Sequence, residues 1–455
     1  MLPIPLKQKL SYLTEHYMAF CPILALIVLI RVGVGDGLAV SALGLLLCAA
    51  GLSQSSARAD PWLLLFMGLY QLGCMASAMV STGSISTGFG AVQLIIPILY
   101  LLMASLSRED LLLLRRLCLL TAAAVAAAGL IQFVGSALVY GGAGRLGGFL
   151  GNPNAMGMFL VLAWFAVLDQ KPHSRTWRLL RHIEPLILAA LALTLSLGSF
   201  LAMALGTLAF FWEKRRLSAF RAALGELCQV LARAVLGMGT GLLLYLTAAH
   251  TSVSWTALLP AGYLCALSFF WPRVIGFFAD LPKMSLLVTA LGLAAAAVVV
   301  LIRPSAAATF PERLEMMASG AQYLTANPFF GVGPYQWRGL DMQDGGKYFS
   351  TWHIHNVPLH MAVETGWLTA AMLIFMAVRF FRRGHSPAER AEGTAFCVHN
   401  LMDTSFFYLG VTGFLFLTVS RPGQRGKKLS GLALKSAFAL CGGLCALHLL
   451  YWLGL

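Results

Sequence analysis

The chain has 455 residues, of which 59% are hydrophobic and 11% charged, and its formal net charge is +14. Soluble globular proteins carry about 25% charged residues, so this composition excludes an ordinary soluble domain. Repeated apolar runs of about 15–25 residues match a bilayer core and predict an all-α, polytopic membrane bundle, not a β-barrel, whose strands alternate.

In chain order, the apolar runs predict about 12–14 spans, two of them broken or re-entrant. The runs lie near residues 14–31, 37–52, 61–80, 88–106, 117–139, 154–168, 185–212, 230–248, 253–272, 284–302, 357–381, 396–420 and 431–451. We divide the chain into N-terminal transmembrane helices (1–140), a core (141–420) and a C-terminal basic segment with the last span (421–455). The core contains one long polar loop, residues 303–356.

The excess of Lys and Arg predicts an orientation in the membrane, not a nucleic-acid partner. Basic residues gather in short loops, as the positive-inside rule requires for the cytoplasmic side, and this rule places the long loop outside. The nine cysteines form no CxxC pair, so they predict neither a zinc site nor a disulfide framework. We therefore expect a lipid bilayer as partner, no nucleic acid, no metal and no cofactor.

Two apolar runs, 185–212 and 396–420, have basic clusters at both ends, so each must leave the cytoplasmic side and return. Both are too short for two full spans of about 20 residues, which predicts half-helices joined at a polar break. The break residues are Thr194, Ser196, Gly198, Ser199, and His399, Asn400, Asp403, Thr404. Non-helical backbone at membrane depth must be buried in protein or line a wet cavity, so we expect both breaks to face the long loop's cavity. The alternative is one span that violates the charge rule.

The sixth span opens with Asn152, a good N-cap, and Pro153, a good first helical residue, followed by Asn154. Arg145 precedes them in a Gly-rich segment. A helix N-terminus beside an arginine favours an anion, so this segment is a candidate anion site. The alternative is a plain helix start.

In the long loop, Thr309-Phe310-Pro311-Glu312 predicts a helix start with Arg313 in its first turn. His353 and His355 form a His-x-His pair, but no third ligand has the regular spacing of a metal site. An imidazole near a carboxylate such as Glu364 serves instead as a general base. A solvated arginine and a structural histidine are the alternatives for these residues taken singly.

Four motifs follow one another through the core: Arg145-x-x-Gly-x-x-Gly-Asn-Pro-Asn, then Arg313 followed by Asn-Pro-x-x-Gly-Val-Gly, then His355-Asn356 with Glu364-x-Gly366, then His399-x-x-x-Asp403. This series resembles the O-antigen ligase and polysaccharide polymerase family, over roughly residues 140–420. The resemblance implies a bacterial membrane glycosyltransferase of the GT-C type. It further implies an undecaprenyl-diphosphate-linked oligosaccharide donor, a metal-independent inverting transfer to a glycan or lipid hydroxyl acceptor, and an active site on the outer face of the cytoplasmic membrane.

The resemblance makes His355 the base that activates the acceptor and makes Arg313 a contact to the donor diphosphate. From its place at the start of the next helix, we expect Glu364 to orient His355. The family usually has Ser-Arg-Gly at its broken helix, whereas this chain has Leu197 where the arginine is expected. Candidate replacements for that charge are Arg145, Arg303 and Arg338. The remaining expected substrate-binding residues are Asn152, Asn154, Ser196, His353, Asn356, His399 and Asp403.

Two other functions fit parts of the pattern. A transporter or flippase would also have many spans around a wet cavity. A catalytically inactive relative would explain Leu197. Ligase and polymerase share donor and membrane face and differ in acceptor, so the sequence leaves that choice open, together with the sugar.

Overall fold

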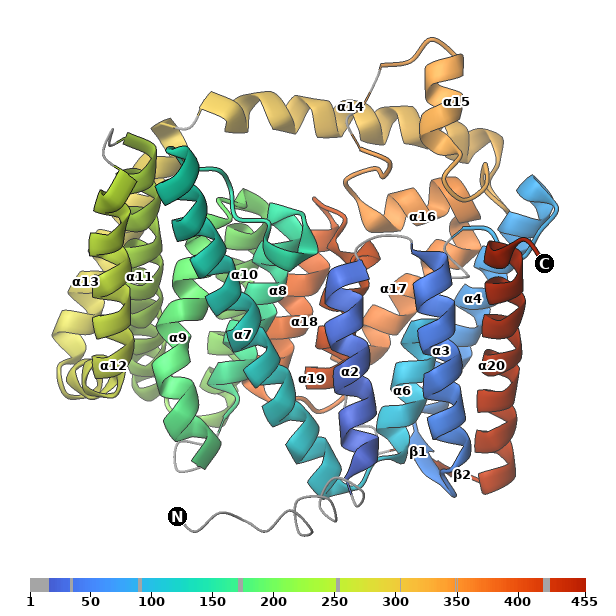
Figure 1. The fold of residues 1–455 in the computed structure, drawn as a ribbon, viewed down its shortest axis with the longest axis horizontal. Helices are drawn as coiled ribbons and strands as arrows, with labels where there is room; N and C mark the ends of the chain where they lie inside the picture. The colour runs from blue at the N-terminus through green and yellow to red at the C-terminus, as the bar shows by residue number, and fades with distance from the viewer. Residues whose placement is uncertain are drawn as a thin grey trace.

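Helices that run side by side form the body of the molecule, and further helices lie across one end of it (Figure 1). The computed structural model describes residues 16–32, 36–88, 92–170, 175–250, 254–302, 304–347, 349, 351–419 and 426–455. The bundle helices are α2 (Tyr17–Val32), α3 (Gly37–Leu52), α4 (Pro61–Thr82), α6 (Ile95–Ser105), α7 (Arg108–Tyr140), α8 (Pro153–Leu168), α9 (Arg175–Leu193), α10 (Leu197–Leu217), α11 (Phe220–His250), α12 (Leu258–Asp280), α13 (Pro282–Ile302), α17 (Trp367–Phe381), α18 (Pro387–Asn400), α19 (Leu409–Val419) and α20 (Gly431–Leu453).

The two ends of the bundle differ. One end, which we call the loop face, carries α14 (Pro304–Ala326), α15 (Trp337–Gln343) and α16 (Val357–Thr365). At the opposite end, β1 (Ala57–Ala59) pairs antiparallel with β2 (Lys427–Leu429). Short 3-10 turns are η1 (Gly148–Leu150), η2 (Ser254–Ala257) and η3 (Ser405–Phe407).

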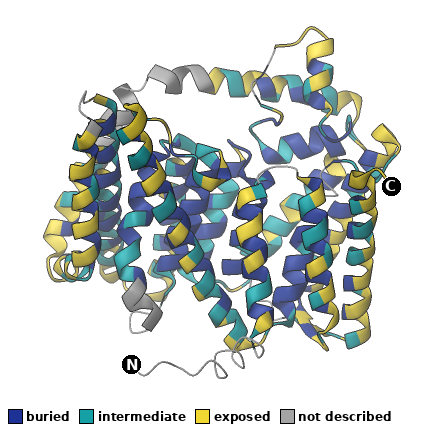
Figure 2. Cartoon of the chain, viewed as in Figure 1, coloured by how far each residue is buried: buried dark blue, intermediate teal, exposed yellow. Residues whose placement is uncertain are grey.

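Length and composition identify membrane-crossing candidates among the described helices. Five are long and apolar enough: Pro61–Thr82, Arg108–Tyr140, Phe220–His250, Trp255–Asp280 and Gly431–Leu453. Bundle helices also expose large apolar residues, among them Leu72, Ile131 and Phe269. Figure 2 shows exposed residues along the outer helices of the bundle. Such surfaces are stable against lipid and costly in water. The predicted helical class is therefore confirmed, apart from the short pair of strands, and the five apolar helices are compatible with the predicted membrane bundle.

One hydrophobic core runs through the bundle. It includes residues from Met18 in α2 to Cys445 in α20, and so extends across all three predicted segments of the chain. Helix α8 lies in the middle of this core, with every residue from Ala155 to Val167 buried. Because α8 begins at the loop face, its N-terminus is held there by a helix that is buried from Ala155 to Val167.

Both predicted breaks are present. Residues 194–196 separate α9 from α10, and residues 401–408 with η3 separate α18 from α19. The prediction of half-helices is wrong for the first pair, because α9 and α10 continue into the basic flanks and reach 19 and 21 residues. At the first break Leu195 has a φ of +49°, a left-handed conformation that is strained for a branched side chain.

Two further expectations are corrected on the loop face. The long polar segment is mostly helical, and α14 begins at Pro304 and continues through Pro311, so the helix start predicted at Thr309 is wrong. The predicted span 357–381 is two helices, because Gly366, with a φ of +87°, turns the chain between α16 and α17. Helix α16 therefore lies across the loop face instead of entering the bundle (Figure 1).

Ion pairs between arginines and buried carboxylates connect helices at the end opposite the loop face. Asp60 at the start of α4 lies 2.8 Å from Arg379 of α17. Arg115 of α7 lies 2.8 Å from the fully buried Glu389 of α18. Buried charges are tolerated when they are paired, and removing one partner is strongly destabilising. These pairs fix α17 and α18, the helices whose other ends carry the polar residues of the loop face.

Candidate functional site

Asp403 is the centre of a polar cluster on the loop face. It is 3% exposed and lies in the non-helical segment between α18 and η3. Its Oδ2 atom accepts a hydrogen bond from the Asn154 amide at 2.8 Å and lies 3.3 Å from Nη2 of Arg313. Nδ1 of His355 is 3.7 Å from the same oxygen. One carboxylate oxygen thus faces an amide, a guanidinium and an imidazole from three distant parts of the chain.

Arg313 reaches the cluster from α14, which crosses above the bundle (Figure 1). Its Nη1 donates to the Met402 carbonyl, and its Nη2 pairs with Asp403. The side chain keeps 25% of its surface exposed. A guanidinium carries five N–H donors, so these two contacts leave donors for a further acceptor.

A second arginine lies on the other side of Asn154. Arg145 donates from Nη2 to Oδ1 of Asn154 at 2.6 Å and from Nε to the Thr194 carbonyl at 2.9 Å. It therefore contacts the first break, three residues before Leu197, the first residue of α10. We call Arg145, Asn154, Arg313, His355 and Asp403 the Asp403 cluster.

The geometry of His355 suits proton transfer. Its Nδ1 faces Asp403, so we assign the ring proton to Nδ1, which leaves Nε2 as an acceptor. The side chain is 17% exposed and lines a cavity. A carboxylate on one ring nitrogen and a cavity beside the ring is the arrangement that a general base requires.

The two breaks contact each other beneath the cluster. Oγ of Ser199 lies 3.2 Å from Nε2 of His399, and Nδ1 of His399 lies 3.0 Å from Oγ of Ser405. Ser196 caps α10 by accepting from the Ser199 amide. The expectation that both breaks line the cavity holds only for the second, because the break residues among the described residues of the lining are Thr404 and Tyr408, and both belong to the second break.

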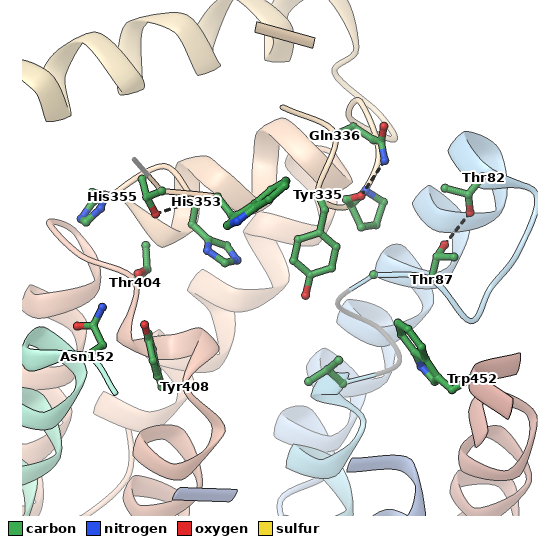
Figure 3. A pocket seen from close by; sticks show the side chains of 15 residues that line it. Thr82, Thr87, Asn152, Tyr335, Gln336, His353, His355, Thr404, Tyr408 and Trp452 are labelled. Atoms are coloured by element: carbon green, nitrogen blue, oxygen red, sulfur yellow. Dashed lines mark hydrogen bonds between the residues drawn. The ribbon is translucent and has the colours of Figure 1, made fainter. Parts of the chain in front are cut away.

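A cavity of about 810 Å³ opens beside the cluster, and we call it the polar cavity (Figure 3). Asn152, His355 and Thr404 lie at one end, and Tyr335 and His353 lie in the middle. The other end is formed by residues of α20 and of the segment that follows α4. Its described lining is Thr82, Thr87, Gly88, Val92, Asn152, Pro334, Tyr335, Gln336, Thr351, Trp352, His353, His355, Thr404, Tyr408 and Trp452.

Glu364 does not orient His355, so that prediction is corrected. Its carboxylate accepts hydrogen bonds from the backbone amides of Tyr335 at 2.6 Å and Trp337 at 3.2 Å, and it lies 3.4 Å from Nε2 of His360. The carboxylate beside His355 is Asp403. Glu364 instead fixes the backbone of Tyr335, whose φ of +61° is strained for an aromatic residue.

Burial sets the protonation of the groups around Glu364. Burial raises the pKa of Glu364 to about 8, although the Tyr335 and Trp337 amides pull it down. Burial, and then the charge of His355, lower the pKa of His353 to about 3. Burial likewise lowers the pKa of His360 well below its usual range. Both histidines are therefore neutral at physiological pH, and His353 stacks on Phe407 at a ring-centroid distance of 4.4 Å.

The remaining predicted residues have other surroundings. Arg338 lies over the ring of Trp352 at 4.5 Å, away from the first break. Asn356 caps α16 and donates to the Leu401 carbonyl. Asn152 caps α8 and lines the polar cavity. Arg303 lies outside the described residues.

No group of three or more His, Cys, Asp or Glu side chains in the described part of the chain is arranged to hold a metal ion. His353 and His355 diverge, because His353 joins an aromatic group with Tyr335 and Phe407 while His355 faces Asp403. The His-x-His pair therefore does not present two ligands to one point.

A second cavity, of about 410 Å³, lies behind the cluster, and we call it the apolar cavity. Its lining from α4, α17, α18 and α19 is almost entirely apolar. It includes Val357 and Leu401, which directly adjoin the cluster through Asn356. At its other end it reaches Arg383 and His385, toward the end of the bundle opposite the loop face.

The sequence motifs did not identify most of the residues that line the polar cavity. Tyr335 carried a signal, because it directly follows the Gly-Val-Gly-Pro motif. Trp352, Tyr408 and Trp452 carried none, since an aromatic residue near a span end is ordinarily a membrane-interface residue.

The sequence matches no protein-family model, and no curated protein matches it.

Proposed function

We propose that the chain is a membrane glycosyltransferase that moves a glycan from a polyprenyl-diphosphate donor to a hydroxyl acceptor, as an O-antigen ligase or a surface-polysaccharide polymerase does. The observation that carries this proposal is the Asp403 cluster, in which two arginines and a histidine from distant segments converge on one asparagine–aspartate pair. The resemblance of the four sequence motifs supports it, since each motif contributes to the cluster or its immediate surroundings.

The transfer needs a base, and His355 supplies it. Nε2 of His355 takes the proton from the acceptor hydroxyl while the oxygen forms a bond to the anomeric carbon. Asp403 stabilises the resulting imidazolium through Nδ1. Such a base contributes about 10²–10⁴-fold to a rate.

The leaving group needs cations, and Arg313 and Arg145 supply them. The bond between the anomeric carbon and the phosphate oxygen breaks, and the diphosphate departs with the electron pair. Planar guanidinium groups bind phosphate oxygens by paired, charge-assisted hydrogen bonds. The family that the motifs resemble carries an arginine at its broken helix, where this chain has Leu197. Arg145 reaches the same break through the Thr194 carbonyl and supplies the cation that Leu197 lacks. Each well-placed contact contributes about 3–4 kcal/mol to the transition state.

The donor's lipid fits the apolar cavity. A polyprenyl chain is apolar along its length, whereas its diphosphate is charged and its sugar polar. The apolar cavity and the polar cavity lie on either side of residues 355–358 and 400–408. This arrangement suits a substrate with one greasy end and one polar end. In this proposal the loop face is the outer face of the bacterial cytoplasmic membrane.

The test is glycan profiling of a deletion strain complemented with wild type, His355→Ala or Arg313→Ala at matched expression. We expect wild type to restore a surface polymer and both variants to fail. Accumulation of long lipid-linked chains would identify a ligase, and accumulation of single lipid-linked repeats a polymerase.

Lys347→Ala is the matched control, because Lys347 lies on the same face in an exposed ion pair with Glu315 and should complement fully. Full complementation by both His355→Ala and Arg313→Ala would sink the proposal. Uptake or flipping by the purified protein in liposomes would then favour a transporter.

A further inference from the structure

The polar cavity has two chemically distinct ends. The Asp403 cluster adjoins the end with Asn152, His355 and Thr404. The opposite end, which we call the far wall, consists of Thr82, Thr87, Gln336 and Trp452 (Figure 3). Tyr335 and His353 lie between the two ends (Figure 3). A cavity of about 810 Å³ is near the upper part of the usual range for ligand sites, so it has room beyond the reacting groups.

The far wall is uncharged. Its side chains offer two hydroxyls, one amide and one indole. Among the described residues that line the whole cavity there is no Lys, Arg, Asp or Glu. A diphosphate would be poorly held here, because it needs cationic donors. Hydroxyls and amides beside aromatic rings instead suit a ligand with many hydroxyl groups and apolar C–H faces, such as a neutral sugar.

The far wall is also held in place before any ligand arrives. Thr82 and Thr87 share a hydrogen bond of 2.6 Å across the turn after α4. The ring of Trp452 lies over Gly37, where an added Cβ would stand 2.2 Å from the indole nitrogen. Gly88 packs equally closely on Pro334, which precedes Tyr335. A wall fixed by packing lowers the entropy cost of binding.

The position of the far wall relative to His355 and the two arginines decides whether it contacts the donor or the acceptor. In an inverting transfer the acceptor hydroxyl attacks from the side opposite the departing diphosphate. Arg145 and Arg313, which would hold the diphosphate, are not among the described lining residues, whereas His355 is. The acceptor must therefore approach His355 through the polar cavity, and its adjoining sugars extend toward the far wall.

We propose that the far wall is a subsite for uncharged sugar units of the acceptor glycan, with Trp452 as a stacking platform and Gln336 as a hydrogen-bonding partner. The proposal rests on the glycosyl transfer described above and adds the acceptor's chemical class and location.

The test measures binding and transfer separately in the purified full-length protein. The binding probe is the neutral repeat unit released by mild acid from the source strain's surface polymer. We expect Trp452→Ala and Gln336→Ala each to weaken binding about tenfold, the effect of losing one or two good contacts. In transfer assays the same variants should raise KM for the acceptor and leave kcat and KM for the donor unchanged.

Two controls separate sugar binding from membrane anchoring. Trp255 is 59% exposed and lies outside the polar cavity, so Trp255→Ala should bind as wild type does. Trp452→Phe keeps an aromatic ring and should retain most of the binding. If wild type transfers glycan but Trp452→Ala and Gln336→Ala bind normally, the subsite is refuted and the glycosyltransferase stands. If wild type binds the repeat through these residues but transfers nothing, the subsite stands and the transfer reaction is refuted.

Discussion

At the scale of single residues, the charge of Asp403 fixes three partners at once. Its Oδ2 contacts Asn154, Arg313 and His355, so one carboxylate orients the proposed base and one of the proposed diphosphate ligands. A buried carboxylate is stable in this position because charged or polar donors surround it. Asp403 acts through these neighbours and is a positioning residue.

Asp403→Asn keeps the shape of the side chain and removes its charge. The amide cannot stabilise an imidazolium on His355, so we expect kcat for glycan transfer to fall about 10²–10⁴-fold, the range for a disabled general base. KM for the acceptor should change little, since Asp403 does not line the polar cavity. Steady-state transfer assays measure both quantities. Asp344→Asn, at an exposed hydrogen bond to Tyr323, is the control and should be neutral; wild-type kcat in Asp403→Asn would contradict the assigned role.

Arg145 contacts the first break and Leu197 directly follows it, and this predicts compensation between them. Arg145→Ala removes the guanidinium that reaches the Thr194 carbonyl, so transfer should drop by roughly 10²-fold or more, as for loss of one charged contact. Adding Leu197→Arg returns a cation to the start of α10 and should restore part of that loss. Transfer assays on the single and double variants provide the test. An Arg145→Ala variant with full activity would remove Arg145 from the diphosphate site.

At the scale of elements, α16 organises the wall of the polar cavity. Its last turn accepts hydrogen bonds from Val332 and Gly333 through the carbonyls of Val363 and Glu364. The Glu364 side chain also accepts hydrogen bonds from the backbone amides of Tyr335 and Trp337. The Gly-Val-Gly-Pro motif is therefore a strap that wraps the end of α16 and presents Tyr335 to the cavity.

Glu364 makes the stability of this strap depend on pH. Between its ordinary pKa of 4.5 and its folded value of about 8, the folded protein holds one more proton than the unfolded chain, so stability falls as pH rises. His353 has the opposite effect on stability between pH values of about 3 and 6.5, because its imidazole is protonated there in the unfolded chain and neutral in the folded protein. From pH 6.5 to 8, Glu364 acts without that opposition, and the melting temperature should decline.

Tryptophan-fluorescence melts of the detergent-solubilised protein measure this decline. Glu364→Gln should start from a lower melting temperature, because its amide nitrogen cannot accept from the Tyr335 or Trp337 backbone. Its melting temperature should also vary less between pH 6.5 and 8. Glu315→Gln, at an exposed ion pair, should keep the wild-type slope. An unchanged slope in Glu364→Gln would assign the pH dependence to other groups.

Gly366 joins α16 to α17 at a point that admits no side chain. A Cβ there would stand 1.8 Å from the Phe329 carbonyl oxygen, and the φ of +87° is itself unfavourable for other residues. Gly366→Ala should therefore destabilise the protein by about 1–3 kcal/mol. Gly339→Ala, in α15 with open space around it, should be neutral or mildly stabilising. Equal melting temperatures for the two variants would show that the turn relaxes freely.

At the scale of the whole molecule, local patterns predicted the parts of the site and missed their assembly. The cap at Asn152 and the two polar breaks follow from the residues at those positions and their immediate neighbours, and each is present. The sequence could not predict that Asp403, and not Glu364, is the carboxylate beside His355, because this depends on how α14, α16 and α18 pack. The same holds for Trp452, which reaches the polar cavity because α20 packs on α3.

The two cavities together predict separate handling of lipid and sugar. Ala377 of α17 lines the apolar cavity, so Ala377→Phe fills space that a long polyprenyl tail would occupy. We expect KM for a long-chain donor to rise about tenfold, which corresponds to about 1.4 kcal/mol, while a donor analogue with a short prenyl chain is used as by wild type. The polar cavity and the Asp403 cluster are untouched by this change, so kcat should stay the same for both donors.

Ala371→Phe is the matched control, because it adds the same ring on the same helix outside the apolar cavity. It should leave KM for both donors unchanged. Equal rises in KM for long and short donors in Ala377→Phe would mean that the ring disturbs α17 generally. Unchanged KM for the long-chain donor would mean that the lipid runs elsewhere along the bundle. A rise in KM confined to the long-chain donor would show that the apolar cavity binds the lipid of the donor whose diphosphate and sugar react at the loop face.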